Sequence, residues 1–180
     1  MTSDHQLSRT LSFLLRHAPQ QAGLTLQPGG WVSVDDLLRG LATQGLTVDR
    51  AQLERVVATS DKQRFTLDAA TDRIRANQGH SVPVDLGLTP LTPPPLLYHG
   101  TAVRLLDTIL REGLRQMQRH HVHLSADPDT ARRVGHRRGP AVILTVDAFG
   151  MLQAGHLFFR SSNGVWLTER VPPEYVRVLK

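Results

Sequence analysis

Cysteine is absent from the 180-residue sequence, which excludes disulfide bonds, thiol nucleophiles and cysteine-ligated zinc sites. Lysine occurs only at Lys62 and Lys180, so arginine carries the excess of basic over acidic residues, 21 to 16. The first residues, MTSDHQLSRTLSFLL, lack the basic region and cleavable apolar stretch of a secretory signal. No apolar run approaches the roughly 18 residues of a membrane span. We therefore expect a cytoplasmic protein with no membrane partner.

The common nucleotide-binding motifs are also missing. The sequence contains neither GxGxxG nor GxxxxGK[ST], so a bound nucleotide would not be held by a Rossmann or P-loop motif. No obvious pair of catalytic carboxylates is present either. Arginine, in contrast, is abundant, and its planar guanidinium suits bidentate binding of phosphate. A GC-rich genome would also raise arginine usage, and composition alone leaves both explanations open.

A proline-rich stretch divides the chain. Residues 81–96 contain Pro83, Pro90, Pro93, Pro94 and Pro95. Such a segment fits neither a helix nor a central strand. We interpret it as a linker between a domain at residues 1–80 and a second at residues 97–180.

The first domain shows three amphipathic helices followed by a hairpin. Apolar residues recur at helical spacing in three groups: Leu7, Leu11, Leu14, Leu15; Val34, Leu37, Leu38, Leu41; and Leu53, Val56, Val57. Ala18-Pro19 ends the first helix, and Asp49 is a candidate N-cap of the third. Residues 64–68 and 73–75 alternate like paired strands. Three helices and a hairpin predict a winged-helix lobe.

The second domain shows short strands interrupted by two helices. Candidate strands lie at residues 96–99, 122–125, 141–146, 157–160, 165–167 and 175–178. One helix is expected from Ala102 to Arg111, with Leu105, Leu106, Ile109 and Leu110 inward and Gly113 as its stop. A second should begin at Asp127-Pro128. Because strands and helices do not alternate regularly, the pattern predicts an α+β fold.

Arginine and histidine are the residues that could carry chemistry. Arg16-His17 ends the first helix, where cations also simply complement the helix dipole. Arg64 opens the hairpin, and Arg119 precedes His121 and His123, which share one face of a strand. Without a nearby carboxylate or cysteine to complete a ligand set, we expect no metal site. The turn-like motif Tyr98-His99-Gly100-Thr101 is weak by itself, because glycine-containing surface turns are common.

Together and in this order, these segments closely resemble the RNA 2′-phosphotransferases known as the Tpt1/KptA family. The matching segments span nearly the whole chain: LSFLLRHAP, GLTLQPGGWVSVDDLL, SDKQRF, IRANQGHS, LYHGT, RHHVHLS and SSNGVWLTERVPPEYV. The combination is specific, although no segment alone is. The resemblance implies an N-terminal winged-helix lobe that engages RNA and a C-terminal ADP-ribosyltransferase-like lobe with a split β-sheet that binds NAD.

The resemblance also implies roles for individual residues. The catalytic set of the family matches Arg16, His17, Arg64 and Arg119. The NAD-lobe signature matches His99, His123 and Val165, with Gly100, Thr101 and Ser125 as neighbouring contacts. Arg138 is a further candidate for the NAD pyrophosphate, although the sequence does not decide between Arg132, Arg133, Arg137 and Arg138. Because the catalytic arginines come from both sides of the linker, we expect the site in a cleft between the two domains.

The family reaction uses NAD as a co-substrate and no metal. The 2′-phosphate of the RNA attacks C1″ of NAD and expels nicotinamide. The ribose 2″-hydroxyl then attacks phosphorus in this ADP-ribosylated intermediate, giving RNA with a 2′-hydroxyl and ADP-ribose 1″,2″-cyclic phosphate. Many ADP-ribosyltransferases have Glu where Val165 stands. A phosphate acceptor is already an anion near neutral pH, and a carboxylate beside it would repel it.

Two alternatives belong to other functional classes. A non-catalytic winged-helix nucleic-acid-binding protein explains residues 1–80 and the basic charge, but not the HGT, HVHLS and NGVWLT motifs. A histidine-dependent metal nuclease would lose activity to a chelator. We expect a monomer that binds NAD and RNA carrying a 2′-phosphate, tRNA-like in the family; the physiological RNA is not specified by the sequence.

Overall fold

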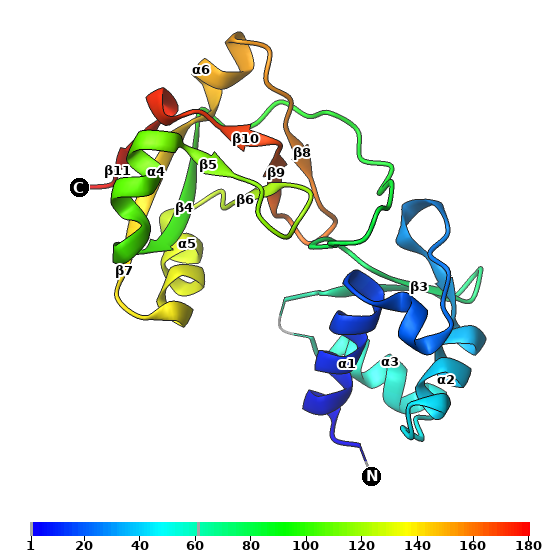
Figure 1. Cartoon of the computed structure of the whole chain (residues 1–180). Coiled ribbons are helices and arrows are strands. Elements are labelled where there is room, and N and C mark those ends of the chain that lie inside the picture. The colour runs from blue at the N-terminus through cyan, green and yellow to red at the C-terminus, as the bar shows by residue number, and fades with distance from the viewer. Residues whose placement is uncertain (1, 61) are drawn as a thin grey trace. The chain divides into compact units, whose positions relative to one another are not determined.

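The structure is a computed structural model that describes all residues except Met1, Asp61 and the side chain of Arg138. The chain divides into two compact units, residues 1–87 and 88–180, so the division falls inside the proline-rich stretch. Both units combine helices with antiparallel strands, which confirms the α+β fold class (Figure 1).

The first unit contains three α-helices and one three-stranded antiparallel sheet among its described residues. In chain order the elements are α1 (Asp4–Arg16), η1 (Pro19–Ala22), η2 (Pro28–Gly30), β1 (Val32–Ser33), α2 (Val34–Thr43), α3 (Arg50–Ala58), β2 (Phe65–Asp68) and β3 (Arg73–Ala76). The strand order is β1-β3-β2. The helices and the hairpin are those that the sequence predicts.

Helix starts in this unit are capped by side-chain oxygens. Ser3 accepts a hydrogen bond from the N–H of Gln6, and Asp49 accepts one from Gln52 at 2.7 Å, which confirms the predicted cap of α3. The core combines the leucine stripe of α1 with the inward face of the sheet. Its fully buried side chains include Leu7, Leu11, Leu15, Leu37, Leu41, Leu53 and Ile74.

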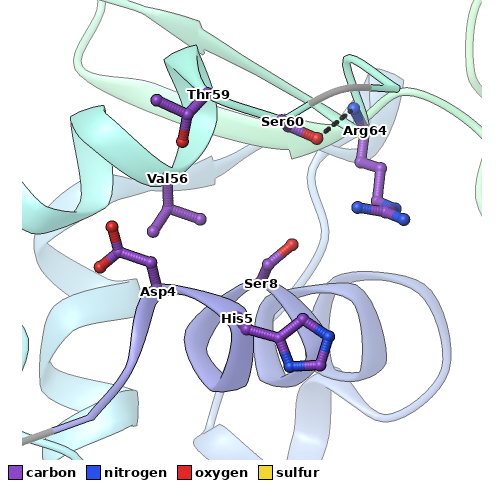
Figure 2. A pocket seen from close by; sticks show the side chains of 7 residues that line it. All are labelled: Asp4, His5, Ser8, Val56, Thr59, Ser60 and Arg64. Atoms are coloured by element: carbon purple, nitrogen blue, oxygen red, sulfur yellow. Dashed lines mark hydrogen bonds between the residues drawn. The ribbon is translucent and has the colours of Figure 1, made fainter.

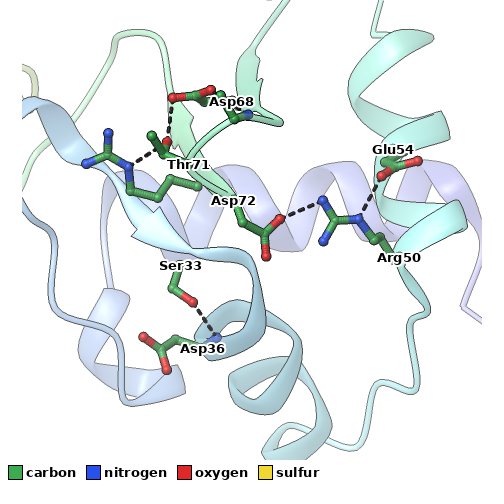
Figure 3. Close-up of polar contacts among 9 residues, drawn as sticks. Ser33, Asp36, Arg50, Glu54, Asp68, Thr71 and Asp72 are labelled. Carbon is green, nitrogen blue, oxygen red and sulfur yellow. Dashed lines mark hydrogen bonds and ion pairs between the residues drawn. The ribbon is translucent and has the colours of Figure 1, made fainter.

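Ion pairs join the helices of the first unit to each other and to the hairpin. Asp4 of α1 accepts two hydrogen bonds from Arg55 of α3, at 2.8 and 2.9 Å, beside a hollow between these helices (Figure 2). At the other end of α3, Arg50 pairs with Glu54 at 2.8 Å and with Asp72 in the hairpin turn at 2.6 Å (Figure 3). The hairpin turn is thereby fixed to the start of α3.

The second unit is built, over its described residues, from three small antiparallel sheets with helices between them. Its elements are β4 (Leu96–Ala102), η3 (Val103–Leu105), α4 (Leu106–Glu112), β5 (Leu114–Arg115), β6 (Val122–Leu124), α5 (Pro128–Gly135), η4 (His136–Arg138), β7 (Ala141–Asp147), α6 (Ala148–Gln153), β8 (Phe159–Arg160), β9 (Trp166–Thr168), β10 (Arg170–Val171), η5 (Pro173–Tyr175) and β11 (Val176–Val178). The strand orders are β11-β7-β4, β6-β9-β8 and β10-β5.

The structure corrects two predictions in this unit. The His99-Gly100-Thr101 motif is not a turn: β4 continues through it to Ala102, because these residues pair with β7 along its length. The following helix also buries a narrower face than expected. Ile109 is buried, whereas Leu105 and Leu110 are each 40% exposed. The reason is that residues 103–105 form a 3₁₀ turn, which shifts the periodicity before α4 begins.

Other predictions for the second unit are confirmed. Asp127 caps α5 by accepting a hydrogen bond from the N–H of Thr130 at 2.7 Å. Gly113 stops α4 with φ 79°, a conformation that favours glycine. The core of the unit gathers Leu97, Leu144, Val146, Met151 and Phe158. Across the described part of the chain, every helix is too short or too polar to cross a membrane.

Candidate functional site

Arg16 and His17 end helix α1 and are held by a segment that follows the hairpin. The carbonyl of Arg16 accepts hydrogen bonds from the N–H groups of Ser81, at 2.8 Å, and Val82, at 3.3 Å. Nδ1 of His17 lies 2.8 Å from Oγ of Ser81. Because the last carbonyls of a helix have no intrahelical partners, these bonds complete the helix end. They also fix the direction of the exposed His17 ring.

Arg64 lies directly before β2, in a bend set by polar groups. Its N–H donates to Oγ of Ser60 at 3.3 Å, and its carbonyl accepts from the N–H of Asn77 at 2.9 Å (Figure 2). The buried amide of Asn77 also donates to the carbonyl of Gln63 at 2.6 Å. Gln63 has φ 42°, a strained value for a residue other than glycine, and this bond helps to hold it.

One short stretch, residues 77–82, therefore supports both parts of the predicted catalytic set in the first unit. Asn77 bonds the chain at Arg64, while Ser81 bonds the end of α1 at Arg16 and His17. No local sequence pattern points to a role for Asn77 or Ser81, although both lie in the IRANQGHS segment. Polar residues after a hairpin are ordinary, and only their long-range partners distinguish these two.

In the second unit, His99 is held in one tautomer. Its Nδ1 lies 3.0 Å from the carbonyl oxygen of His123. A carbonyl only accepts, so Nδ1 of His99 carries the proton and Nε2 keeps a lone pair. Burial lowers the pKa of His99 below its usual 6.5, and the bond to His123 opposes this effect only in part. His99 is therefore a neutral imidazole with an acceptor nitrogen near pH 7.

Arg119 contacts His123 directly. The distance between Nη1 of Arg119 and Nδ1 of His123 is 3.1 Å. A guanidinium only donates hydrogen bonds, so Nδ1 of His123 accepts and a neutral ring carries its proton on Nε2. This contact joins a residue of the predicted catalytic set to a residue of the predicted NAD-binding set.

Strand pairing brings the three predicted NAD-binding segments side by side. Tyr98 and Ser125 exchange backbone hydrogen bonds of 2.8 and 2.9 Å, which places the HGT motif next to HVHLS. His123 in turn pairs with Leu167 of β9. Val165 lies directly before β9, where Ser161 bonds both its N–H, at 3.1 Å, and its carbonyl, at 2.9 Å. Its side chain is partly exposed.

Packing accounts for Gly100 and Thr101 without a ligand. A Cβ on Gly100 would lie 2.0 Å from the carbonyl oxygen of Ala131 in α5, so only glycine allows this close approach of helix and strand. Thr101 is 6% exposed and pairs with Val142 of β7. A role for either residue in binding NAD remains a prediction.

The arginines around α5 differ in their partners. Arg132 pairs with Asp129 at 2.7 Å, and Arg133 donates to the hydroxyl of Thr130 at 2.9 Å. Arg137 is exposed, and the side chain of Arg138 lies outside the described part of the structure. Across the residues that the structure describes, no group of three or more histidine, aspartate or glutamate side chains is placed to hold a metal ion.

Comparison with known proteins gives matches over almost the whole chain. The model of a family described as "RNA 2'-phosphotransferase, Tpt1 / KptA family" matches residues 2–170. A probable RNA 2′-phosphotransferase of Trichormus variabilis is 53% identical over 174 residues, which cover 97% of this chain and 96% of the relative. Proteins of the same description from Streptomyces griseus and Burkholderia lata are 54% and 57% identical, covering 95% and 96% of this chain and 94% and 89% of theirs.

Proposed function

Because this chain belongs to the Tpt1/KptA family of RNA 2′-phosphotransferases, we propose that it removes an internal 2′-phosphate from RNA by transferring it to NAD. The products are RNA with a 2′-hydroxyl, ADP-ribose 1″,2″-cyclic phosphate and nicotinamide. The RNA 2′-phosphate is first ADP-ribosylated. The observation that carries the proposal is the family match from residue 2 to residue 170, and the contact of Arg119 with His123 supports it from the geometry.

The second unit offers groups that fit NAD. NAD supplies the electrophilic ribose carbon that receives the phosphate and the neighbouring hydroxyl that later attacks phosphorus. Nε2 of His99 presents a lone pair, which suits a ribose or amide donor, since Nδ1 is committed to the carbonyl of His123. His123 presents an N–H on its other nitrogen. The two rings thus form an acceptor and donor pair on adjacent strands. Ser125 and Val165 extend the proposed NAD site, and Arg138 is kept as a candidate for the pyrophosphate.

The proposed role of the cationic side chains is to hold and stabilise the phosphate. Under this proposal, Arg16, Arg64 and Arg119 all act on the same 2′-phosphate, whose dianion suits bidentate guanidinium groups. Negative charge grows on the phosphoryl oxygens and on the leaving 2′-oxygen when phosphorus is attacked. Preorganised donors stabilise that charge. His17, whose Nδ1 lies 2.8 Å from Oγ of Ser81, is proposed to transfer a proton to or from the reacting oxygens.

The proposal gives each unit a distinct task. The first unit has the order α1, β1, α2, α3, β2, β3 with an antiparallel β1-β3-β2 sheet. This order supports the proposed assignment of the unit as a winged helix that binds RNA. The second unit is proposed as an ADP-ribosyltransferase-like lobe with a split sheet. Its separate β4 and β6 pairings, joined at Tyr98 and Ser125, support that assignment.

Incubation with NAD and a synthetic RNA that carries one internal 2′-phosphate tests the function. The RNA should lose its 2′-phosphate only when NAD is present, with one nicotinamide released per phosphate transferred. Release of inorganic phosphate without NAD would identify a phosphatase instead. RNA binding without any NAD-dependent product would favour a non-catalytic binding protein.

A further inference from the structure

A hollow of about 190 Å³ lies in the first unit beside Arg64 (Figure 2). The start of α1 forms one wall, and the end of α3 with the bend that follows it forms the other. The lining side chains are Asp4, His5, Ser8, Val56, Thr59, Ser60 and Arg64. Arg64 belongs to the proposed catalytic set, so the hollow borders a residue that the proposed function assigns to the 2′-phosphate.

Helical spacing connects the same hollow to the other end of α1. His5, Ser8, Ser12 and Arg16 follow one another at intervals of three or four residues, so they lie on one face of α1. The buried leucines occupy the adjoining face. Ser8 and Arg16 are eight residues apart, which is about 12 Å along a helix axis. A polar stripe therefore runs from the hollow to the proposed phosphate-binding arginine.

The hollow contains hydrogen-bond donors that the described protein does not use. Neither the ring of His5 nor the hydroxyl of Ser8 makes a hydrogen bond or ion pair with any residue that the structure describes. Ser60 accepts from the N–H of Arg64, and its own O–H is left to donate. Together with the guanidinium of Arg64, these groups favour a ligand that is anionic and rich in oxygen.

The carboxylate of Asp4, which also lines the hollow, repels an anionic ligand only weakly. Asp4 is held by two hydrogen bonds from Arg55, which lower the pKa of Asp4 to about 2. The pair is close to neutral as a whole. Thr59 is similarly satisfied, because its hydroxyl donates to the carbonyl of Arg55 at 2.8 Å. The unused donors are therefore those of His5, Ser8 and Ser60.

We propose that this hollow binds the ribose-phosphate backbone of a nucleotide next to the one that carries the 2′-phosphate. The proposal rests on the proposed function, since that function places a 2′-phosphate at Arg64. Hydroxyl, imidazole and guanidinium donors are the groups that proteins use against phosphate and sugar oxygens. Apart from the imidazole of His5, the described lining holds one small apolar side chain, Val56, and no aromatic ring on which a base would stack. The subsite therefore recognises RNA independently of base sequence.

The test compares the binding of two ligands by isothermal titration calorimetry: a six-nucleotide RNA with an internal 2′-phosphate, and a nucleoside 2′-phosphate that has no neighbouring nucleotide. Ser8→Leu fills the hollow. It should weaken binding of the six-nucleotide RNA about tenfold, the equivalent of one lost charge-assisted hydrogen bond. The binding ratio between the two ligands should fall by a similar factor. Gln6→Leu, an exposed change on the same helix outside the hollow, should leave that ratio unchanged.

His5→Ala provides a second variant, because it removes a donor from an exposed position without adding bulk, and it should lower the ratio in the same direction. Equal weakening of both ligands by Ser8→Leu, or an unaltered ratio in both variants, would overturn the proposal. So would a wild-type protein that binds the two ligands equally well. The proposed function is tested separately by turnover. RNA binding that depends on Ser8, without any NAD-dependent turnover, would support the subsite and refute the proposed function.

Discussion

At the scale of single residues, the hydroxyl of Ser81 contributes to the site through another side chain. It lies 2.8 Å from Nδ1 of His17, and the N–H of the same residue bonds the carbonyl of Arg16. The hydroxyl of Ser81 can donate or accept, so it can bond either tautomer of His17. The backbone bond to Arg16 fixes the position of Ser81 itself. The proposed role of Ser81 is positioning, and it requires no contact with substrate.

Ser81→Ala should therefore lower kcat about fivefold, which corresponds to the loss of one hydrogen bond of roughly 1 kcal/mol. The KM for NAD should not change, because the proposed NAD-binding residues His99 and His123 lie on β4 and β6. Ser81→Thr, which restores a hydroxyl, should recover most of the rate. The ¹⁵N shift of Nδ1 of His17 reports on this hydrogen bond directly. An unaltered shift in Ser81→Ala would contradict the assignment even if activity fell.

Replacement of the proposed catalytic residues should separate the two chemical steps. Alanine at Arg16, His17, Arg64 or Arg119 is expected to slow attack on phosphorus more than attack on NAD, because only the former builds charge on phosphoryl oxygens. A single preorganised donor contributes about 10²- to 10³-fold to such a step. RNA with an ADP-ribosylated 2′-phosphate should accumulate in time courses followed by gel or mass spectrometry. Recovery of unreacted substrate alone from all four variants would refute this division.

The partly buried His99 predicts how stability depends on pH. Its pKa is lowered by burial in the folded state, so the unfolded chain binds the proton more tightly below pH 6.5. The free energy of unfolding should thus decrease as the pH falls from 6.5 toward the folded-state pKa of His99. His121, whose pKa burial also lowers, adds to this loss, whereas Asp4 acts only below about pH 4. Urea unfolding at pH 7 and pH 5 measures the effect. His99→Gln should show a smaller difference between the two.

At the scale of secondary structure, helices and strands were predicted best where apolar residues recur with a strong periodicity. The leucine stripe of α1, the Asp49 cap of α3 and the β2–β3 hairpin follow from local pattern alone. The two-residue strands β5 and β10 lack a pattern of their own and form only because each pairs with the other. The HGT motif was predicted as a turn because glycine is usually found in turns; here it lies in a strand that α5 approaches closely.

Gly100→Ala tests that approach. A methyl group at this position would meet the carbonyl oxygen of Ala131, and backbone atoms cannot move aside as a flexible side chain can. The substitution should reduce the free energy of unfolding by about 1–3 kcal/mol in the absence of any ligand, as overpacked core sites do. Chemical denaturation provides the measurement. A variant as stable as the wild type that only fails to use NAD would assign Gly100 to ligand binding instead.

The residues of the candidate site were harder to predict from the sequence than the helices and strands. Arg16, His17, Arg64 and Arg119 were selected through the family resemblance, since arginine at a helix end or hairpin start is common. Bonds such as that between Asn77 and the carbonyl of Gln63 join residues far apart in sequence. No local periodicity encodes them. The tautomer of His99 likewise depends on which backbone carbonyl lies beside it in the folded chain.

At the scale of the whole molecule, the two units have separate hydrophobic cores, and the first extends beyond the boundary expected from the prolines. Residues 81–87 pack on the first unit: Ser81 bonds Arg16, and the carbonyl of Asp85 accepts from the N–H of Gly29 at 2.7 Å. A fragment of residues 1–87 should therefore unfold cooperatively by itself.

A fragment of residues 1–80 lacks these bonds and should be less stable by about 1–3 kcal/mol, the contribution of two or three hydrogen bonds. Thermal unfolding followed by circular dichroism compares the two fragments under identical conditions. Equal melting temperatures would show that residues 81–87 contribute nothing to the first unit and act only as a connection.

The bonds made by residues 77–82 should restrict how the length of this stretch varies among related proteins. The stretch bonds the chain at Arg64 through Asn77 and the end of α1 through Ser81, so the spacing between these two residues matches the separation of their partners. An inserted or deleted residue would displace one partner or the other. Among relatives, substitutions should be tolerated at several positions of this stretch, whereas its length should stay constant. Where the serine is replaced, a compensating change is expected at the histidine it bonds or in the turn that carries it.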